Sequence, residues 1–226
     1  PYWFVFFLLI LSLVLIAFVF RETLPETARR RVSYTEAFTN LAKVVEPGGP
    51  RSIYLANFLI FFSVFGFFRA FPIYLVERFG MGVSEISNYI AWNAVPIVLS
   101  SVWLAGFLAK RYPPRAITLY SSIVFGLACL VLSLPLPQYS LWLTLFFPGA
   151  ALAVAIPACT TMLSFKVSGS QQGEALGNNL SLEVGAEVLS GVAVGFLASA
   201  MIPLPLASMT AIAILGALVV ILFVDK

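Results

Sequence analysis

The sequence contains no histidine, only two cysteines and few charged residues. Histidine is the commonest general base and metal ligand near neutral pH, so its absence removes the usual histidine-based catalytic and metal sites. Cys129 and Cys159 each lie in an apolar run with no thiol nearby, and we expect reduced packing residues and no disulfide. Charged residues make up 10% of the chain and the net charge is only +3, which gives no indication of a nucleic-acid partner.

Sequence motifs for catalysis are also missing. The chain has no glycine-rich phosphate loop, no G-x-S-x-G and no cysteine or histidine spacing for a metal. An intramembrane hydrolase would need buried acids, but Glu183 and Glu187 lie on one predicted helix with no nucleophile motif opposite them. The sequence therefore predicts no enzyme, no metal site and no cofactor.

Hydrophobic residues are abundant, at 61% of the chain with a mean hydropathy of +1.00. A soluble domain cannot bury that much apolar surface. We expect an all-α membrane protein, because seven apolar runs are long enough to cross a bilayer. These runs are Tyr2–Phe20, Ser52–Val76, Ser84–Ala109, Ala116–Leu134, Leu141–Phe165, Glu174–Ala200 and Leu204–Val224.

Three parts follow from this pattern: a transmembrane helix at 1–20, a loop at 21–51 and a six-helix bundle at 52–226. Within the loop, Ser33 and Glu36 have the spacing of a capping box, and apolar residues then repeat at helical spacing. We expect a short amphipathic helix at the membrane surface, ended by the Pro-Gly-Gly-Pro of 47–50.

Basic residues fall mostly on one side of these predicted spans, which makes that side cytoplasmic. The C-terminus then lies in the cytoplasm, and we expect a multi-pass protein of a bacterial-type inner membrane. The other side receives Arg78. The basic residues on the first side are Arg21, Arg29, Arg30, Arg31, Lys43, Arg51, Lys110, Arg111, Arg115, Lys166 and Lys226.

The run at 171–200 carries two glutamates in its interior. At about 1.5 Å per residue, Glu183 lies roughly 14 Å into the membrane, where an unpaired carboxylate costs at least about 2.5–3.5 kcal/mol. We expect a polar pathway along this face, which also holds Gln172, Asn179, Glu187 and Ser190. A second stripe, Gly173, Gly177, Gly191 and Gly195, is expected to let a neighbouring helix approach closely.

Polar residues divide the last six spans into two triplets. The third and sixth spans hold nothing more polar inside than Ser, Thr and Cys, and we expect them to face lipid. The fourth is interrupted by Pro148, Gly149 and Pro157. Repeated triplets with broken helices are typical of secondary transporters. The other spans carry Asn57 and Arg69, Asn88 and Asn93, and the two glutamates.

Each polar residue has an alternative interpretation. Glu183 and Glu187 are either a proton-accepting or cation-binding pair, in which double ionisation is disfavoured, or structural hydrogen-bond partners. Arg69 either snorkels to the headgroups or faces the cavity as a counter-ion to a substrate or to Glu187. Asn57 and Asn93 either form hydrogen bonds between helices or contact a ligand.

Three segments resemble the major facilitator superfamily. GFLAKRYPPR at 106–115 resembles the G-x-L-a-D-R-x-G-R-R loop between the second and third helices of each half of that family, with Gly106, Arg111 and Arg115 in matching positions. QQGEALGNNLSLEVGAEVLSGVAVG resembles the eleventh helix of its drug-exporter branch, and WFVFFLLILSLVLIAFVFRETLP resembles the sixth helix of that branch and its exit. Lys110 replaces the acid of the loop motif and Pro113 its glycine, so a charge relay through that acid cannot operate here.

The resemblance implies helix six, the central cytoplasmic loop and the C-terminal half, built from two inverted three-helix repeats. A missing N-terminal half would complete the cavity. The implied activity is proton-coupled movement of a small molecule by alternating access, with export of a drug-like compound or metabolite as the direction. Two other hypotheses stay open: a proton-coupled importer and a non-transporting membrane scaffold or receptor.

Overall fold

The computed structural model describes residues 2–19, 44 and 50–224. The chain divides into two units, Pro1–Ala37 and Phe38–Lys226. The described part of the first unit is helix α1 (Tyr2–Val19), which is apolar throughout and long enough to cross a membrane. The expected amphipathic helix and Arg29–Arg31 lie outside the described residues.

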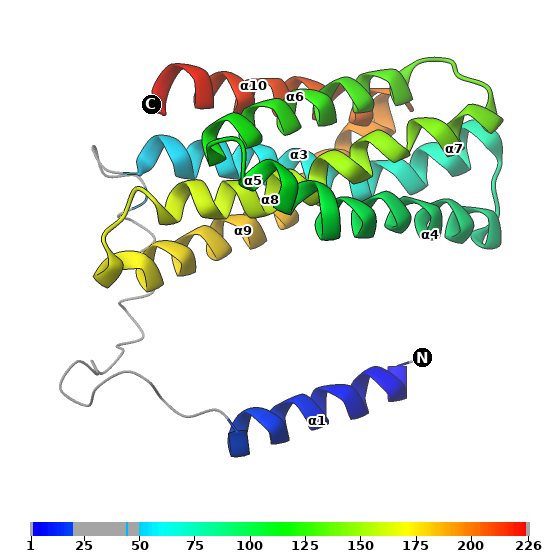
Figure 1. The fold of residues 1–226 in the computed structure, drawn as a ribbon. Helices are drawn as coiled ribbons and strands as arrows, with labels where there is room; N and C mark the ends of the chain where they lie inside the picture. The colour runs from blue at the N-terminus through cyan, green and yellow to red at the C-terminus, as the bar shows by residue number, and fades with distance from the viewer. Residues whose placement is uncertain (1, 20–43, 45–49, 225–226) are drawn as a thin grey trace. The chain divides into compact units, whose positions relative to one another are not determined.

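The second unit is a bundle of helices (Figure 1). Two spans are each built from several helical segments: Val83–Ala109 and Gln138–Ser164. With α1, the described residues form seven helices able to span a membrane, and each boundary lies within three residues of the prediction. The elements are α3 (Arg51–Phe79), α4 (Val83–Leu99), the π-helix η2 (Ser100–Leu104), α5 (Ala105–Ala109), α6 (Pro114–Ser133), the 3₁₀-helix η3 (Gln138–Ser140), α7 (Leu141–Thr144), α8 (Phe146–Ser164), the 3₁₀-helix η4 (Gly169–Gln171), α9 (Gln172–Ala200) and α10 (Leu204–Phe223).

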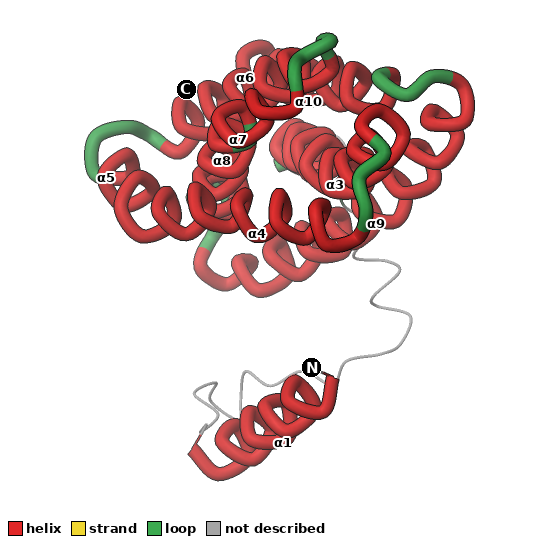
Figure 2. The backbone as a smooth tube through the Cα atoms, turned by 90° about the vertical axis from the view of Figure 1, so that its right-hand side faces the viewer, coloured by secondary structure: helices red, strands yellow, loops and turns green. Residues whose placement is uncertain are grey.

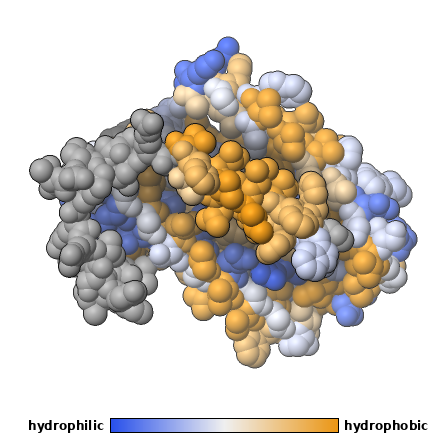
Figure 3. Space-filling model, turned by 90° about the horizontal axis from the view of Figure 1, so that it is seen from below, coloured by the Kyte–Doolittle hydropathy of each residue, from blue (hydrophilic) through white to orange (hydrophobic). Residues whose placement is uncertain are grey.

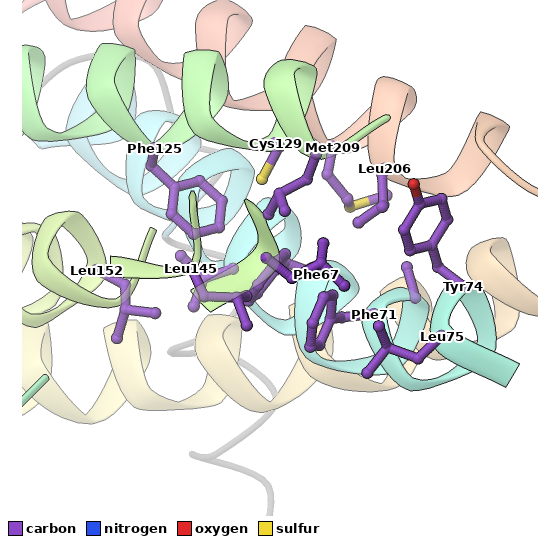
Figure 4. Packing of buried hydrophobic residues seen from close by; sticks show 14 of the residues in the cluster. Phe67, Phe71, Tyr74, Leu75, Phe125, Cys129, Leu145, Leu152, Leu206 and Met209 are labelled. Carbon is purple, nitrogen blue, oxygen red and sulfur yellow. The ribbon is translucent and has the colours of Figure 1, made fainter. Parts of the chain in front are cut away.

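Helix α3 lies at the centre of the bundle. It packs against α8, α9 and α10, and the end-on view in Figure 2 shows helices of this unit around it. Its aromatic residues Phe67 and Phe71 stack at 5.5 Å between ring centroids, and Phe67 meets Phe125 of α6 edge-on. Leu206 and Met209 of α10 close this core (Figure 4). Apolar packing on several sides thus fixes α3.

Two of the spans change their helical form partway along. The span Gln138–Ser164 breaks at Leu145, between α7 and α8, because Pro148 has no N–H to bond the carbonyl of Thr144. Pro157, by contrast, lies inside α8 without ending it. The π-helical segment η2 begins one turn after Pro96 and was not predicted.

Close helix contacts occur at glycines other than the predicted stripe. A Cβ on Gly149 would lie 2.6 Å from Oδ1 of Asn93 and 3.0 Å from its backbone oxygen. In contrast, a Cβ on any glycine of the predicted stripe, Gly173, Gly177, Gly191 and Gly195, meets no described atom within 4 Å. No described helix therefore packs on that stripe, and close approach there stays a prediction for other segments. The glycines in contact with a neighbouring helix are Gly66, Gly126, Gly149 and Gly216.

Gly149→Ala is expected to lower the stability of the protein by about 1–3 kcal/mol, because overpacking of this size forces α4 and α8 apart. Gly191→Ala is the matched control: it adds the same methyl group to open space, and alanine has the higher helix propensity. The melting temperatures of both variants in detergent check this. An unchanged melting temperature for Gly149→Ala would contradict the close packing of α4 on α8.

Two of the helices with polar interiors, α4 and α9, are less covered than α6 and α10, whereas the third, α3, is 56% buried. In the most apolar stretch of each span, 17% of α9 and 17% of the span containing α4 is buried, against 50% of α6 and 39% of α10. The outward faces of α6 and α10 carry exposed leucines and valines, as expected for contact with lipid. Helices α4 and α9 therefore keep more of their surface open than α6 and α10 do.

Candidate functional site

An ion pair joins α3 to α9. Nη2 of Arg69 lies 3.1 Å from Oε1 of Glu187 and donates a hydrogen bond to it. Arg69 stands ten residues before the end of α3 and Glu187 thirteen before the end of α9, about 15 and 20 Å along the helix axes. A hydrocarbon core is about 30 Å thick, so both charges lie well inside it. The counter-ion interpretation of Arg69 agrees with this geometry, and snorkelling does not.

The pair is open at the surface of the bundle. The side chain of Arg69 is 57% exposed and that of Glu187 is 42% exposed. Figure 3 views the molecule from the side of α4 and α9 in Figure 1 and shows hydrophilic areas between hydrophobic side chains. An exposed ion pair at this depth needs water or another polar surface in front of it, because lipid solvates it poorly.

Glu183 adds a second carboxylate to this site. It precedes Glu187 by one turn, about 6 Å along the axis, and is half-buried. It forms no hydrogen bond or ion pair with any described residue. The site therefore contains two carboxylates and one guanidinium, and with both acids ionised it has one uncompensated negative charge.

A row of phenylalanines leads along α3 to Arg69. Phe58, Phe62 and Phe65 precede it at helical spacing and are partly buried. They pack against a cluster that includes Ala186, the neighbour of Glu187 on α9. The ring centroids of Phe58 and Phe62 are 6.2 Å apart. Sequence reasoning missed this row, although its spacing of four, three and four residues from Phe58 to Arg69 was a signal in the sequence.

Asn57 and Asn179, both predicted as site residues, are used inside the bundle. Nδ2 of Asn57 donates to Oδ1 of Asn179 at 2.8 Å and also points to the carbonyl of Cys159 at 3.3 Å. Both asparagines are buried. The polar stripe of α9 is therefore divided, since Asn179 and Ser190 turn into the bundle while Glu183 and Glu187 stay at its edge. This corrects the expectation of one continuous polar pathway.

Asn93 of α4 is buried as well. Its Oδ1 has no hydrogen-bond partner among the described residues and lies against Gly149. Asn88, by contrast, is exposed. Trp92 donates to the carbonyl of Trp142 at 2.5 Å and meets its ring edge-on, so it packs within the bundle. The structure does not bring Asn93 to the charged site.

The loop between α5 and α6 holds the residues that resemble the family motif. Arg115 donates from Nε and Nη2 to the carbonyls of Val220 and Ile221 at 3.3 and 3.0 Å. It thereby satisfies carbonyls in the last turn of α10, where cations are favoured. The guanidinium of Arg111 lies 4.1 Å from the ring centroid of Phe107. Lys110 is exposed, and a Cβ on Gly106 would meet nothing within 4 Å.

Metal-ligating side chains do not gather in the described part of the chain: no three of His, Cys, Asp or Glu come together there. Both cysteines are buried and free. The charged site is thus built from two acids and a guanidinium, which can bind a proton or an organic cation.

Comparison with known proteins identifies the family. Residues 53–226 match the family described as the Major Facilitator Superfamily, which covers the helices from α3 to α10. No individual curated protein matches the chain. The family consists of secondary transporters that carry small molecules across a lipid bilayer. The chain, with its seven apolar helices, is a multi-pass membrane protein that belongs to the major facilitator superfamily.

Proposed function

We propose that the chain forms half of a proton-coupled transporter that exports a small cationic molecule by alternating access. The observation that carries this proposal is the charge imbalance at Arg69, Glu183 and Glu187. A second half, outside this chain, would cover the open faces of α4 and α9 and complete the cavity. Rocking of the two halves would then expose the site to each side in turn.

Charge counting supports exchange of a proton for the substrate. With both carboxylates ionised, the site carries a net charge of −1, and either one proton or one cationic group restores neutrality. When one of these binds, the other loses its electrostatic attraction, because a second positive charge would leave the site at +1. Mutual exclusion of this kind is what an antiporter requires, and the inward proton gradient of an inner membrane would drive export.

The phenylalanine row supports an apolar or aromatic body for the substrate. Phe58, Phe62 and Phe65 are partly buried and follow one face of α3 toward Arg69. Aromatic faces attract cations within about 6 Å and also pack against flat apolar groups. We therefore propose amine-bearing, partly aromatic molecules as the substrate class.

The membrane orientation is proposed from charge. Most described basic residues outside the spans lie at one end of the bundle, called the basic end below, and Arg78 lies at the other end. The residues at the basic end are Arg51, Lys110, Arg111, Arg115 and Lys166. By the positive-inside rule we propose that the basic end faces the cytoplasm, and we propose a bacterial-type inner membrane as the location.

The proposal is tested with the full-length parent protein in weakly buffered detergent solution and then in liposomes. Addition of a cationic drug from a panel of lipophilic amines is expected to release about one proton per bound molecule at near-neutral pH, since drug and proton compete for one charge. In liposomes, an inward proton gradient is expected to drive the same drug out of the lumen of right-side-out vesicles. Binding without proton release would contradict proton coupling at this site.

Direction is read from the same liposomes. Accumulation of the drug in step with protons would identify an importer and overturn export. Binding without any flux would favour the scaffold or receptor hypothesis and overturn transport.

A further inference from the structure

A concave surface lies on another part of the bundle, lined by none of the residues of the charged site. It is an apolar groove of about 590 Å³ between η2–α5 and α6, with α8 as its floor. Leu104, Leu108 and Val124 contribute to its walls, and Tyr112 and Tyr120 stand at its side. Figure 1 shows α5, α6 and α8 close together.

The groove follows from residue size and from the turn that joins its walls. Ala150 and Ala151 of α8 leave room on the floor, where larger side chains would fill the space. On the α6 wall the lining extends from Ala116 to Val124, eight residues or about 12 Å along the helix, and Leu104, Leu108 and Tyr112 line the other wall. The turn from α5 to α6 joins the walls at the basic end, so the groove runs from the basic end toward the membrane interior.

Two cations stand at this turn. Lys110 and Arg111 directly follow Leu108 and Ala109 and precede the lining residue Tyr112. Both are exposed, and neither forms an ion pair with a described acidic side chain. The guanidinium of Arg111 lies over the ring of Phe107, next to the lining residue Leu108 in sequence. The nearby Arg115 is already engaged by the carbonyls of α10.

We propose that this groove binds an anionic phospholipid, with an acyl chain along α5 and α6 and the phosphate on Lys110 and Arg111. An apolar groove open to a bilayer is filled by an acyl chain, and cations at its end favour a headgroup with net negative charge. Tyr112 lines the groove at this end, and tyrosine is the residue type enriched at membrane interfaces. The site is separate from the Arg69–Glu187 pair and does not depend on proton coupling.

Native mass spectrometry of the intact 226-residue chain tests this with phosphatidylglycerol and phosphatidylcholine of identical acyl chains. The wild type is expected to retain phosphatidylglycerol in preference. Lys110→Gln/Arg111→Gln is expected to lower that preference by about tenfold or more, since each basic residue near the surface attracts anionic lipid. Arg51→Gln/Arg78→Gln is the control, because it removes the same charge away from the groove and is expected to keep the preference.

A second variant tests the groove itself. Ala150→Phe keeps both cations but fills the floor, and it is expected to reduce retention of both lipids, with the remaining binding still favouring phosphatidylglycerol. Unchanged retention in Ala150→Phe would overturn the acyl-chain site. An equal loss of preference in the Arg51→Gln/Arg78→Gln control would also overturn the proposal, because it would assign the effect to overall surface charge. The melting temperature of each variant confirms folding before lipid is added.

Discussion

Glu183→Gln is expected to abolish substrate-evoked proton flux in liposomes containing the complete transporter proposed above, while the melting temperature stays at the wild-type value. The variant removes the carboxylate that forms no ion pair with a described residue and leaves the Arg69–Glu187 pair in place. The site is then neutral without a proton. Neither a proton nor a cationic drug gains the electrostatic attraction that the wild-type site offers, so drug-evoked flux is expected to fall to the level of protein-free vesicles.

Two controls separate coupling from folding. Glu183→Asp keeps the charge with a shorter side chain and is expected to retain coupled flux at a lower rate. Glu85→Gln removes an acid at the start of α4, where it caps the N–H of Gly82, and is expected to leave coupling unchanged. Full proton-coupled transport in Glu183→Gln would sink the assignment and would place coupling in the half that completes the cavity.

Glu187→Gln is expected to differ from Glu183→Gln in stability. It also removes the negative charge that couples flux to pH, but it breaks the pair that joins α3 to α9. Loss of coupling in both variants, with a lowered melting temperature in Glu187→Gln alone, would distinguish the two roles.

The spans were predictable because their signals are local. Each is an apolar run of membrane length, and turns such as Gly80–Gly82 or the prolines of 135–137 interrupt the pattern. Gly80 ends α3 with φ of 65°, a conformation that glycine adopts without strain. The Arg69–Glu187 contact was also within reach as one alternative, because two opposite charges inside membrane spans have few other partners.

The rotation of each helix was not predictable. In a soluble helix the polar face marks the outside, but inside a membrane bundle the polar stripe of α9 can turn either to a neighbouring helix or to an open surface. The spacing of Asn179 and Glu183 placed both on one stripe, yet Asn179 turns to Asn57 and Glu183 stays at the edge. Residues on one stripe can spread over about 40° or more, enough to divide it between an interface and an open surface.

Glycine positions failed as signals for the same reason. A glycine permits close approach but does not specify which helix approaches, so Gly149 and Gly191 look alike in sequence. Only the packing of α4 on α8 distinguishes them, and that depends on the break at Leu145 and on the π-helical segment η2. Both features depend on how carbonyls without a helical partner are accommodated by neighbouring helices.

Arg69→Glu is expected to be the most damaging single substitution at the site. It places three carboxylates together inside the membrane spans and removes their only described cation. The expected loss is roughly 3 kcal/mol, between the value of about 1 for exposed pairs and about 3–5 for broken buried pairs. The yield of folded protein in the membrane and the melting temperature in detergent measure it, and coupled transport is expected to be absent.

The double variant Arg69→Glu/Glu187→Arg restores one positive and one negative charge across the same contact and is expected to recover most of the lost stability. Arg78→Glu is the control for charge reversal on the same helix. Its guanidinium lies 5.7 Å from the ring centroid of Tyr74 at the end of α3, where water is accessible, so a small effect is expected. If the double variant is no more stable than Arg69→Glu, the two side chains do not act as a pair. Recovery of stability without recovery of coupling would show that the pair holds α3 to α9 while the position of each charge decides transport. In the double variant Glu183 would precede an arginine by one turn of its own helix, and its negative charge would be compensated there.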